Sequence, residues 1–165
     1  MTKEQKQIFL SDLSARLPYN LIVQIEGCGI WNLRGIDHDD SAELRDRVIV
    51  WHGKNYPSSK NSFPIINCKP YLFPLSSMTE EQKEDLLLTV VGEDGLKLFS
   101  VTKDGIISND EKEQSLENFC FNNINFSNET IESYIDWLNK NHFDYRGLIE
   151  KGLAIDATNI NCYNN

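Results

Sequence analysis

Hydrophobic and polar positions follow a helical period at the start of the chain. In Lys3–Leu17 the apolar side chains stand three or four residues apart, with Leu10 and Leu13 on the same stripe. This spacing predicts an amphipathic helix. Thr2 and Gln5 stand three residues apart at its start, as a capping box requires.

The pattern then changes to short runs rich in β-branched residues. The segments Leu21–Glu26, Ile30–Ile36 and Arg45–Trp51 are each typical of a strand. Gly27 and Gly29 mark a tight reversal between the first two segments. Together these features predict an antiparallel meander after the N-terminal helix.

Prolines shape the next part of the pattern. Gly53–Ser62 is polar and predicts a long loop, and Phe63–Cys68 predicts a short strand. Lys69–Leu75 contains two prolines, which lack the N–H that a central strand needs, so we expect an extended apolar crossing there. A second capping box, Thr79 with Gln82, predicts a helix that runs to about residue 90.

The second half repeats this mixture of strands and helices. Asp104-Gly105 is a strong turn signal and predicts a hairpin between Leu96–Val101 and the apolar pair that follows. Phe119–Phe126 alternates in part and predicts an edge strand. Apolar residues at helical spacing predict a last helix over Glu129–Asn141.

Length and composition bound the fold class. The chain has 165 residues, of which 40% are hydrophobic and 25% are charged, as in an average globular domain. We therefore expect one α+β domain over residues 1–158, followed by a flexible tail over 159–165. The elements above predict an N-terminal helix, an antiparallel sheet of about five strands and two further helices.

Charge narrows the partners that the chain can have. The net charge is −9, from 16 basic and 25 acidic side chains. Binding of nucleic acid needs a basic face, so general nucleic-acid binding is disfavoured, and so is an anionic membrane surface. The sign suits a cationic protein partner or plain solubility.

Targeting signals and cysteines predict a cytoplasmic location. The N-terminus is a polar helix start without an apolar region behind it, and no apolar run approaches the length of a membrane span. The four cysteines are widely spaced and form no Cys-x-x-Cys pair, so we expect reduced thiols in the cytosol and no zinc site.

Three segments are more specific than periodicity explains. They are residues 69–81 (KPYLFPLSSMTEE), residues 136–154 (DWLNKNHFDYRGLIEKGLA) and, more weakly, residues 12–19 (DLSARLPY). These segments resemble a widespread family of uncharacterised proteins from gut Bacteroidales genomes, which often occur in prophages, phages and other mobile elements. The resemblance implies a bacterial or phage-infected cytosol. It implies no activity, and it carries over no catalytic residue.

The stretch His142-Phe143-Asp144-Tyr145-Arg146-Gly147 is the strongest candidate for a binding site. His142, Asp144, Tyr145 and Arg146 combine titratable, aromatic and cationic groups, and the Arg146 guanidinium offers a planar bidentate fork. The structural alternative is that Asp144 caps a short helix over Tyr145–Lys151, while Arg146 pairs with an internal carboxylate or with backbone carbonyls. We favour the structural alternative.

Other candidates lie on the predicted sheet. Arg34, Arg47 and Trp51 combine the residue types that dominate interfaces and stack on bases. Core burial is the default for tryptophan. Asp37-His38-Asp39-Asp40 is dense in metal-capable groups but lacks the spacing of a calcium loop, so a solvated turn is favoured and no metal or cofactor is expected.

Three functions follow from these patterns. The first is a non-enzymatic accessory protein of a phage or mobile element that binds a protein partner. The second is an anti-defence protein that sequesters a small nucleotide signal on Arg34, Arg47 and Arg146. The third is an enzyme with a site assembled from scattered residues, which is less favoured because no Gly-x-Ser-x-Gly elbow or P-loop is present. The sequence leaves the oligomeric state open.

Overall fold

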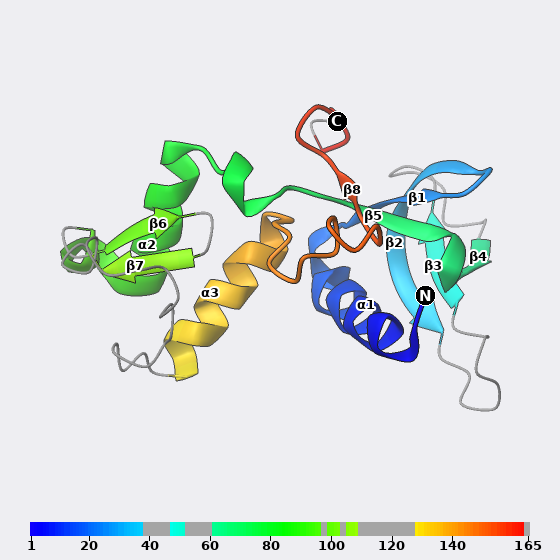
Figure 1. The fold of residues 1–165 in the computed structure, drawn as a ribbon, viewed down its shortest axis with the longest axis horizontal. Coiled ribbons are helices and arrows are strands. Elements are labelled where there is room, and N and C mark those ends of the chain that lie inside the picture. Colours follow the sequence, from blue (N-terminus) through cyan, green and yellow to red (C-terminus); the bar gives the residue numbers. More distant parts are fainter. Residues whose placement is uncertain (38–46, 52–60, 97–98, 103–104, 109–127, 164–165) are drawn as a thin grey trace. The chain divides into compact units, whose positions relative to one another are not determined.

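The structure is a computed structural model, shown in Figure 1. It describes residues 1–37, 47–51, 61–96, 99–102, 105–108 and 128–163. The chain divides into two compact units. The first unit combines Met1–Leu72 with Asp144–Asn165, and the second unit is the continuous segment Phe73–Phe143. The α+β class predicted from the sequence is confirmed, whereas the prediction of one domain over 1–158 stays a prediction.

The first helix forms as its pattern predicts. Helix α1 spans Lys3–Arg16, and the Thr2 side chain accepts a hydrogen bond from the backbone N–H of Gln5 while the Gln5 side chain accepts one from the backbone N–H of Thr2. Phe9 and Leu13 are buried on its apolar stripe. The capping box therefore sets where α1 begins, and the stripe sets which face it buries.

The first unit contains a mixed sheet. Its described strands lie in the order β4-β3-β2-β1-β5-β8. Their bounds are β1 Ile22–Ile25, β2 Gly29–Asp37, β3 Arg47–Trp51, β4 Asn61–Pro64, β5 Cys68–Leu72 and β8 Ile155–Asp156. The predicted meander is confirmed, because β1, β2 and β3 pair antiparallel in sequence order. The strand β8 pairs parallel with β5. The sheet is therefore mixed, whereas the sequence predicted an antiparallel sheet.

The strand β5 corrects the prediction that its prolines exclude it from the interior of the sheet. It lies between β1 and β8, and Pro70 stands opposite Val23 of β1. The two-residue β8 reaches only Tyr71 and Leu72. Among the described strands, Pro70 therefore has no partner on the β8 side, and its missing N–H breaks no ladder hydrogen bond there.

The core of the first unit lies between α1 and one face of the sheet (Figure 1). Phe9 and Leu13 of α1 pack in one cluster with alternate residues of the strands. The fully buried strand residues are Val23, Ile25, Leu33, Val48, Val50 and, at the end of β5, Leu72. Burial on alternate positions is the expected result of strands with one covered face.

Short 3₁₀ turns link these elements. They are η1 Leu17–Tyr19, which follows α1 at Pro18, η2 Ile65–Asn67 and η3 Leu75–Ser77. η2 separates β4 from β5, so the predicted short strand over Phe63–Cys68 is interrupted.

The second unit consists of two helices and a hairpin. Its elements are α2 Glu80–Gly95, β6 Phe99–Thr102, β7 Gly105–Ser108 and α3 Asn128–Lys140. The Thr79–Gln82 capping box is present. The helical path breaks at Gly92, whose φ is 71°, two residues beyond the predicted end. The hairpin is confirmed, with Thr102 paired to Gly105.

One predicted helix does not form, and several other predictions concern residues that the structure does not describe. The expected short helix over Tyr145–Lys151 is a run of turns. The predicted edge strand Phe119–Phe126 and most of the polar loops after Asp37 and Trp51 lie outside the described residues. In the last segment, the Tyr163 hydroxyl donates to the backbone oxygen of Tyr71 at 2.6 Å. The flexible tail over 159–165 stays a prediction.

Candidate functional site: an arginine cluster on the first unit

The cluster is built on a buried ion pair within α1. Asp12 and Arg16 are one helical turn apart, and both side chains are fully buried. Nε of Arg16 donates to Oδ2 of Asp12 at 2.8 Å, and Nη2 donates to Oδ1 at 3.0 Å. This bidentate geometry is the one that best repays the desolvation of a guanidinium and a carboxylate.

A second guanidinium reaches the same carboxylate. Nε of Arg146 lies 3.5 Å from Oδ1 of Asp12, which is longer than a normal hydrogen bond. That Nε is buried and has no hydrogen-bond partner among the described residues. The Arg146 side chain is 30% exposed. Two guanidiniums thus share one carboxylate, and the cluster carries an excess positive charge on an acidic protein.

The ring of Tyr145 joins the two arginines. The guanidinium carbon of Arg16 lies 5.5 Å from the ring centroid, and that of Arg146 lies 5.0 Å from it. Both distances fall within the range of a cation–π interaction. The ring therefore restrains the half-buried guanidinium of Arg146 as well as covering the buried one.

Asp144 and Lys151 hold the turn that carries Arg146. The Asp144 carboxylate accepts hydrogen bonds from the backbone N–H groups of Leu148, at 2.8 Å, and Ile149, at 2.7 Å. Nζ of Lys151 donates to the backbone oxygen of Arg146 at 2.9 Å. The structural alternative predicts the capping role of Asp144, and an internal carboxylate is one of the two partners that it allows for Arg146.

His142 lies in the second unit and shapes the end of α3. Its φ is 59°, in the left-handed region. The N–H of His142 bonds to the oxygen of Asn139, and the N–H of Phe143 bonds to the oxygen of Leu138. This pair of bonds is a Schellman motif, in which His142 occupies the position that usually holds glycine. Its backbone thus has a structural role.

The remaining predicted site residues lie on the sheet of the first unit. Arg34 is exposed, and its Nη1 donates to Oδ1 of Asn20 at 2.8 Å. Arg47 is exposed, and its Nε donates to Oγ of Ser62 at 2.6 Å. Trp51 ends β3, and its side chain lies outside the description. The structure thus brings Tyr145 and Arg146 into the cluster, while these contacts hold Arg34 and Arg47 elsewhere.

Sequence reasoning missed Asp12 and Arg16 as members of the site. A signal was present, because their i, i+4 spacing is that of a helical ion pair and they flank Leu13 on the buried side of α1. Charged residues next to the apolar stripe of a helix are candidates for a buried pair.

The described residues offer little for chemistry. Within that part of the chain, no group of three or more His, Cys, Asp or Glu side chains is placed to hold a metal ion. Asp37 is the only described member of the Asp37–Asp40 run. Burial raises the pKa of the Cys68 thiol to about 12, so it stays protonated at neutral pH and is a poor nucleophile.

Comparison with protein-family models, curated proteins and solved structures gives no match for this chain. None of the described helices is long and apolar enough to cross a membrane.

Proposed function

We propose that the chain is a non-enzymatic accessory protein of a phage or mobile element, and that it binds a protein partner through Tyr145 and Arg146. The observation that carries the proposal is the Arg146 side chain, which is 30% exposed while its Nε is buried without a hydrogen-bond partner among the described residues. The carboxylate that it meets within the described part of the chain, that of Asp12, is already bound on both oxygens by Arg16. A ligand carboxylate would complete the pairing of Arg146.

The composition and setting of the cluster support this function. Arginine and tyrosine are enriched at the energetically dominant positions of protein interfaces. The Tyr145 ring and the Asp144-capped turn restrain Arg146 before a partner arrives, which reduces the ordering cost of binding. Two of the three segments that resemble the mobile-element proteins supply the cluster, residues 12–19 and 136–154.

Affinity capture tests the proposal. The tagged full chain is incubated with lysate of a gut Bacteroidales bacterium, with and without phage infection, and bound proteins are quantified by mass spectrometry. We expect one stoichiometric partner for the wild type, and at least about tenfold less of it for Arg146→Ala. Because Arg16 already binds both Asp12 oxygens, this variant keeps the buried pair.

Arg34→Ala is the matched control, because it removes an exposed guanidinium from the same unit at a place outside the cluster. It should recover as much partner as the wild type. Recovery of the chain alone by the wild type, or equal recovery by Arg146→Ala, would show the proposal to be wrong.

One observation also favours the nucleotide-sequestering function. The cluster joins an aromatic ring to two guanidiniums, a combination that can stack on a base and bind phosphate. Arg34 and Arg47 already have other hydrogen-bond partners, so we assign this function to Arg146 and Tyr145 alone. A panel of cyclic nucleotides tests it, since a ligand that binds the native state raises the melting temperature. Absence of any shift would eliminate it.

A further inference from the structure

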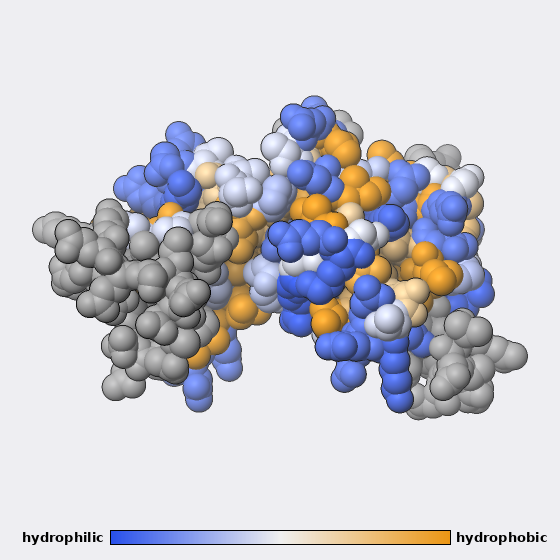
Figure 2. All heavy atoms as spheres, in the orientation of Figure 1, coloured by the Kyte–Doolittle hydropathy of each residue, from blue (hydrophilic) through white to orange (hydrophobic). Residues whose placement is uncertain are grey.

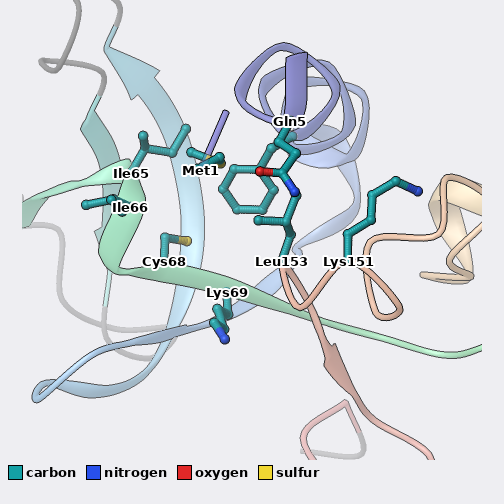
Figure 3. Close-up of a pocket in the computed structure, with 9 residues that line it drawn as sticks. Met1, Gln5, Ile65, Ile66, Cys68, Lys69, Lys151 and Leu153 are labelled. Carbon is teal, nitrogen blue, oxygen red and sulfur yellow. The ribbon is translucent and has the colours of Figure 1, made fainter. Parts of the chain in front are cut away.

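A hollow with a volume of about 220 Å³ lies on the first unit. Its apolar lining comes from the N-terminus, α1, η2, β5 and the segment after the arginine turn, and consists of Met1, Phe9, Ile65, Ile66, Cys68 and Leu153. Figure 3 shows that Lys69 and the Lys151 amine extend away from its centre. The Gln5 amide, in contrast, lies among the apolar side chains, so the lining is mixed, with apolar groups on most sides.

The rim of this hollow exposes apolar surface. Ile66 is 63% exposed and Met1 is 45% exposed. Figure 2 shows hydrophobic surface beside the N-terminus, over the segment that joins β4 to β5. Large apolar side chains that gather around a depression are typical of a surface that binds a partner.

The hollow and the arginine cluster are neighbours along two segments. Gln5 and Phe9 line the hollow, and Asp12 follows on the same side of α1. With a rise of 1.5 Å per residue, Asp12 lies about 5–10 Å along the axis from these two residues. Lys151 connects the same two places, because it stands at the hollow and donates to the backbone oxygen of Arg146.

We propose that the hollow and Arg146 together bind an extended peptide segment of a partner protein. The segment places one apolar side chain in the hollow and a carboxylate, two or three residues away, on Arg146. The spacing takes the axial separation of about 5–10 Å between the hollow residues of α1 and Asp12, whose Oδ1 lies 3.5 Å from Nε of Arg146, and divides it by the advance of an extended chain, about 3.3 Å per residue. This proposal rests on the proposed protein-binding function and specifies its ligand.

Charge complementarity selects an acidic rather than a basic segment. Among the described residues, the ion pairs of the cluster join two guanidiniums to one carboxylate, so these groups attract an anion locally. The net charge of −9 opposes an acidic partner at long range. Physiological salt screens charges that lie beyond about 8 Å. The positive charge of the cluster, and not the net charge of the protein, therefore determines that an anionic group is attracted at contact.

Fluorescence anisotropy with a designed peptide series tests the proposal on the full chain. Each labelled peptide has a Gly/Ser background with one Leu and one Glu, separated by one to six positions. We expect the tightest binding at a separation of two or three. Replacing the Glu of the best peptide with Gln should weaken binding about tenfold, because a charge-assisted pair is lost.

Protein variants assign the two contacts separately. Arg146→Gln should abolish the preference for Glu over Gln, and Ile66→Ser should abolish the preference for Leu over Ser. Leu88→Ser is the control, since Leu88 is an exposed apolar residue of the second unit, at 40% exposure. It should leave both preferences unchanged. If circular dichroism shows that Arg146→Gln does not fold, a peptide with Lys in place of Glu is used with the wild-type chain. It tests whether the site prefers a negatively or a positively charged side chain.

Binding that is independent of the separation, or stronger binding of the Lys peptide, would overturn the proposal. So would displacement of the peptide by inorganic phosphate with no effect of Ile66→Ser, which would indicate a simple anion site. If no peptide binds while the chain still captures a protein through Arg146, the peptide mode is wrong and the protein-binding function stands. If capture fails as well, both are wrong.

Discussion

The two units of the molecule use polar groups in opposite ways. The first unit encloses a charged pair, Asp12 with Arg16, from which water is fully excluded. The second unit anchors its helices with a neutral donor, because Nε1 of Trp137 donates to the carboxylate of Asp85, an exposed residue of α2, at 2.7 Å. The consequence is an unequal sensitivity to substitution, since a buried ion that loses its partner costs far more than a surface carboxylate that returns to water.

The units also differ in how the chain builds them. In the first unit β5 pairs with β1, which precedes it, and with β8, which follows more than 80 residues later. The second unit uses one continuous segment, Phe73–Phe143. Features that depend on distant segments therefore gather in the first unit, and the arginine cluster is one of them.

Asp12→Ala should produce the largest effect. It removes the Asp12 carboxylate from the fully buried Arg16 and from Arg146. We expect the free energy of unfolding to fall by about 3–5 kcal/mol. Urea denaturation followed by circular dichroism measures the change.

The matched control for this substitution is Glu80→Ala in the second unit. Glu80 pairs with Lys83 at 2.6 Å, but its side chain is 89% exposed. An exposed helical pair contributes about 0–1 kcal/mol, so the control should change stability little. Similar losses for the two variants would contradict the contrast between the units.

The difference between local contacts and contacts of distant segments explains what the sequence could predict. The capping boxes at Thr2 and Thr79 and the hairpin at Gly105 depend on residues a few positions apart, and local patterns were sufficient to find them. The place of Pro70 inside the sheet depends on how short β8 is, which no local pattern near residue 70 shows.

In the candidate site, too, the sequence predicted the local contact and not the distant one. The turn capped by Asp144 is local, and the sequence predicted the cap, although it predicted a helix where turns occur. For Arg146 the sequence left an internal carboxylate and backbone carbonyls as alternatives. Asp12 lies 134 positions earlier, and no pattern near residue 146 identifies it as the carboxylate that Arg146 meets. Long-range pairing is decided by how the whole sheet brings α1 and the turn together.

Asp144→Ala should have the second-largest effect, again in the first unit. Two backbone N–H groups, those of Leu148 and Ile149, lose a charged acceptor, and Leu148 is fully buried. We expect a loss of about 2 kcal/mol in the free energy of unfolding. Asp144→Asn keeps one acceptor oxygen and should lose less. Equal losses from Asn and Ala would show that the charge, and not the cap geometry, is what matters.

Trp137→Phe tests the neutral anchor of the second unit. The indole also stacks on Phe143, with 5.7 Å between the ring centroids, and a phenyl ring retains most of that contact. The lost N–H donor leaves only the exposed Asp85 carboxylate, so we expect a loss of about 1.5 kcal/mol by urea denaturation. A loss as large as that of Asp12→Ala would remove the distinction between the two kinds of anchor.

The smallest effect should come from the thiol in the hollow of the first unit. Burial raises the pKa of Cys68 from 9.0 to about 12, so the folded state holds this proton while the unfolded state releases it. The contribution of Cys68 is therefore complete below pH 9 and is lost as the pH rises from 9 towards 12. Between pH 7 and pH 9.5, the free energy of unfolding should fall by about 1 kcal/mol more in the wild type than in Cys68→Ala. The pKa values of buried tyrosines are raised as well. Both proteins contain these tyrosines, so their contribution to the pH dependence cancels when the two pH series are compared. Parallel pH profiles of the two proteins would mean that water reaches the sulfur, and the hollow would then be more polar than its lining indicates.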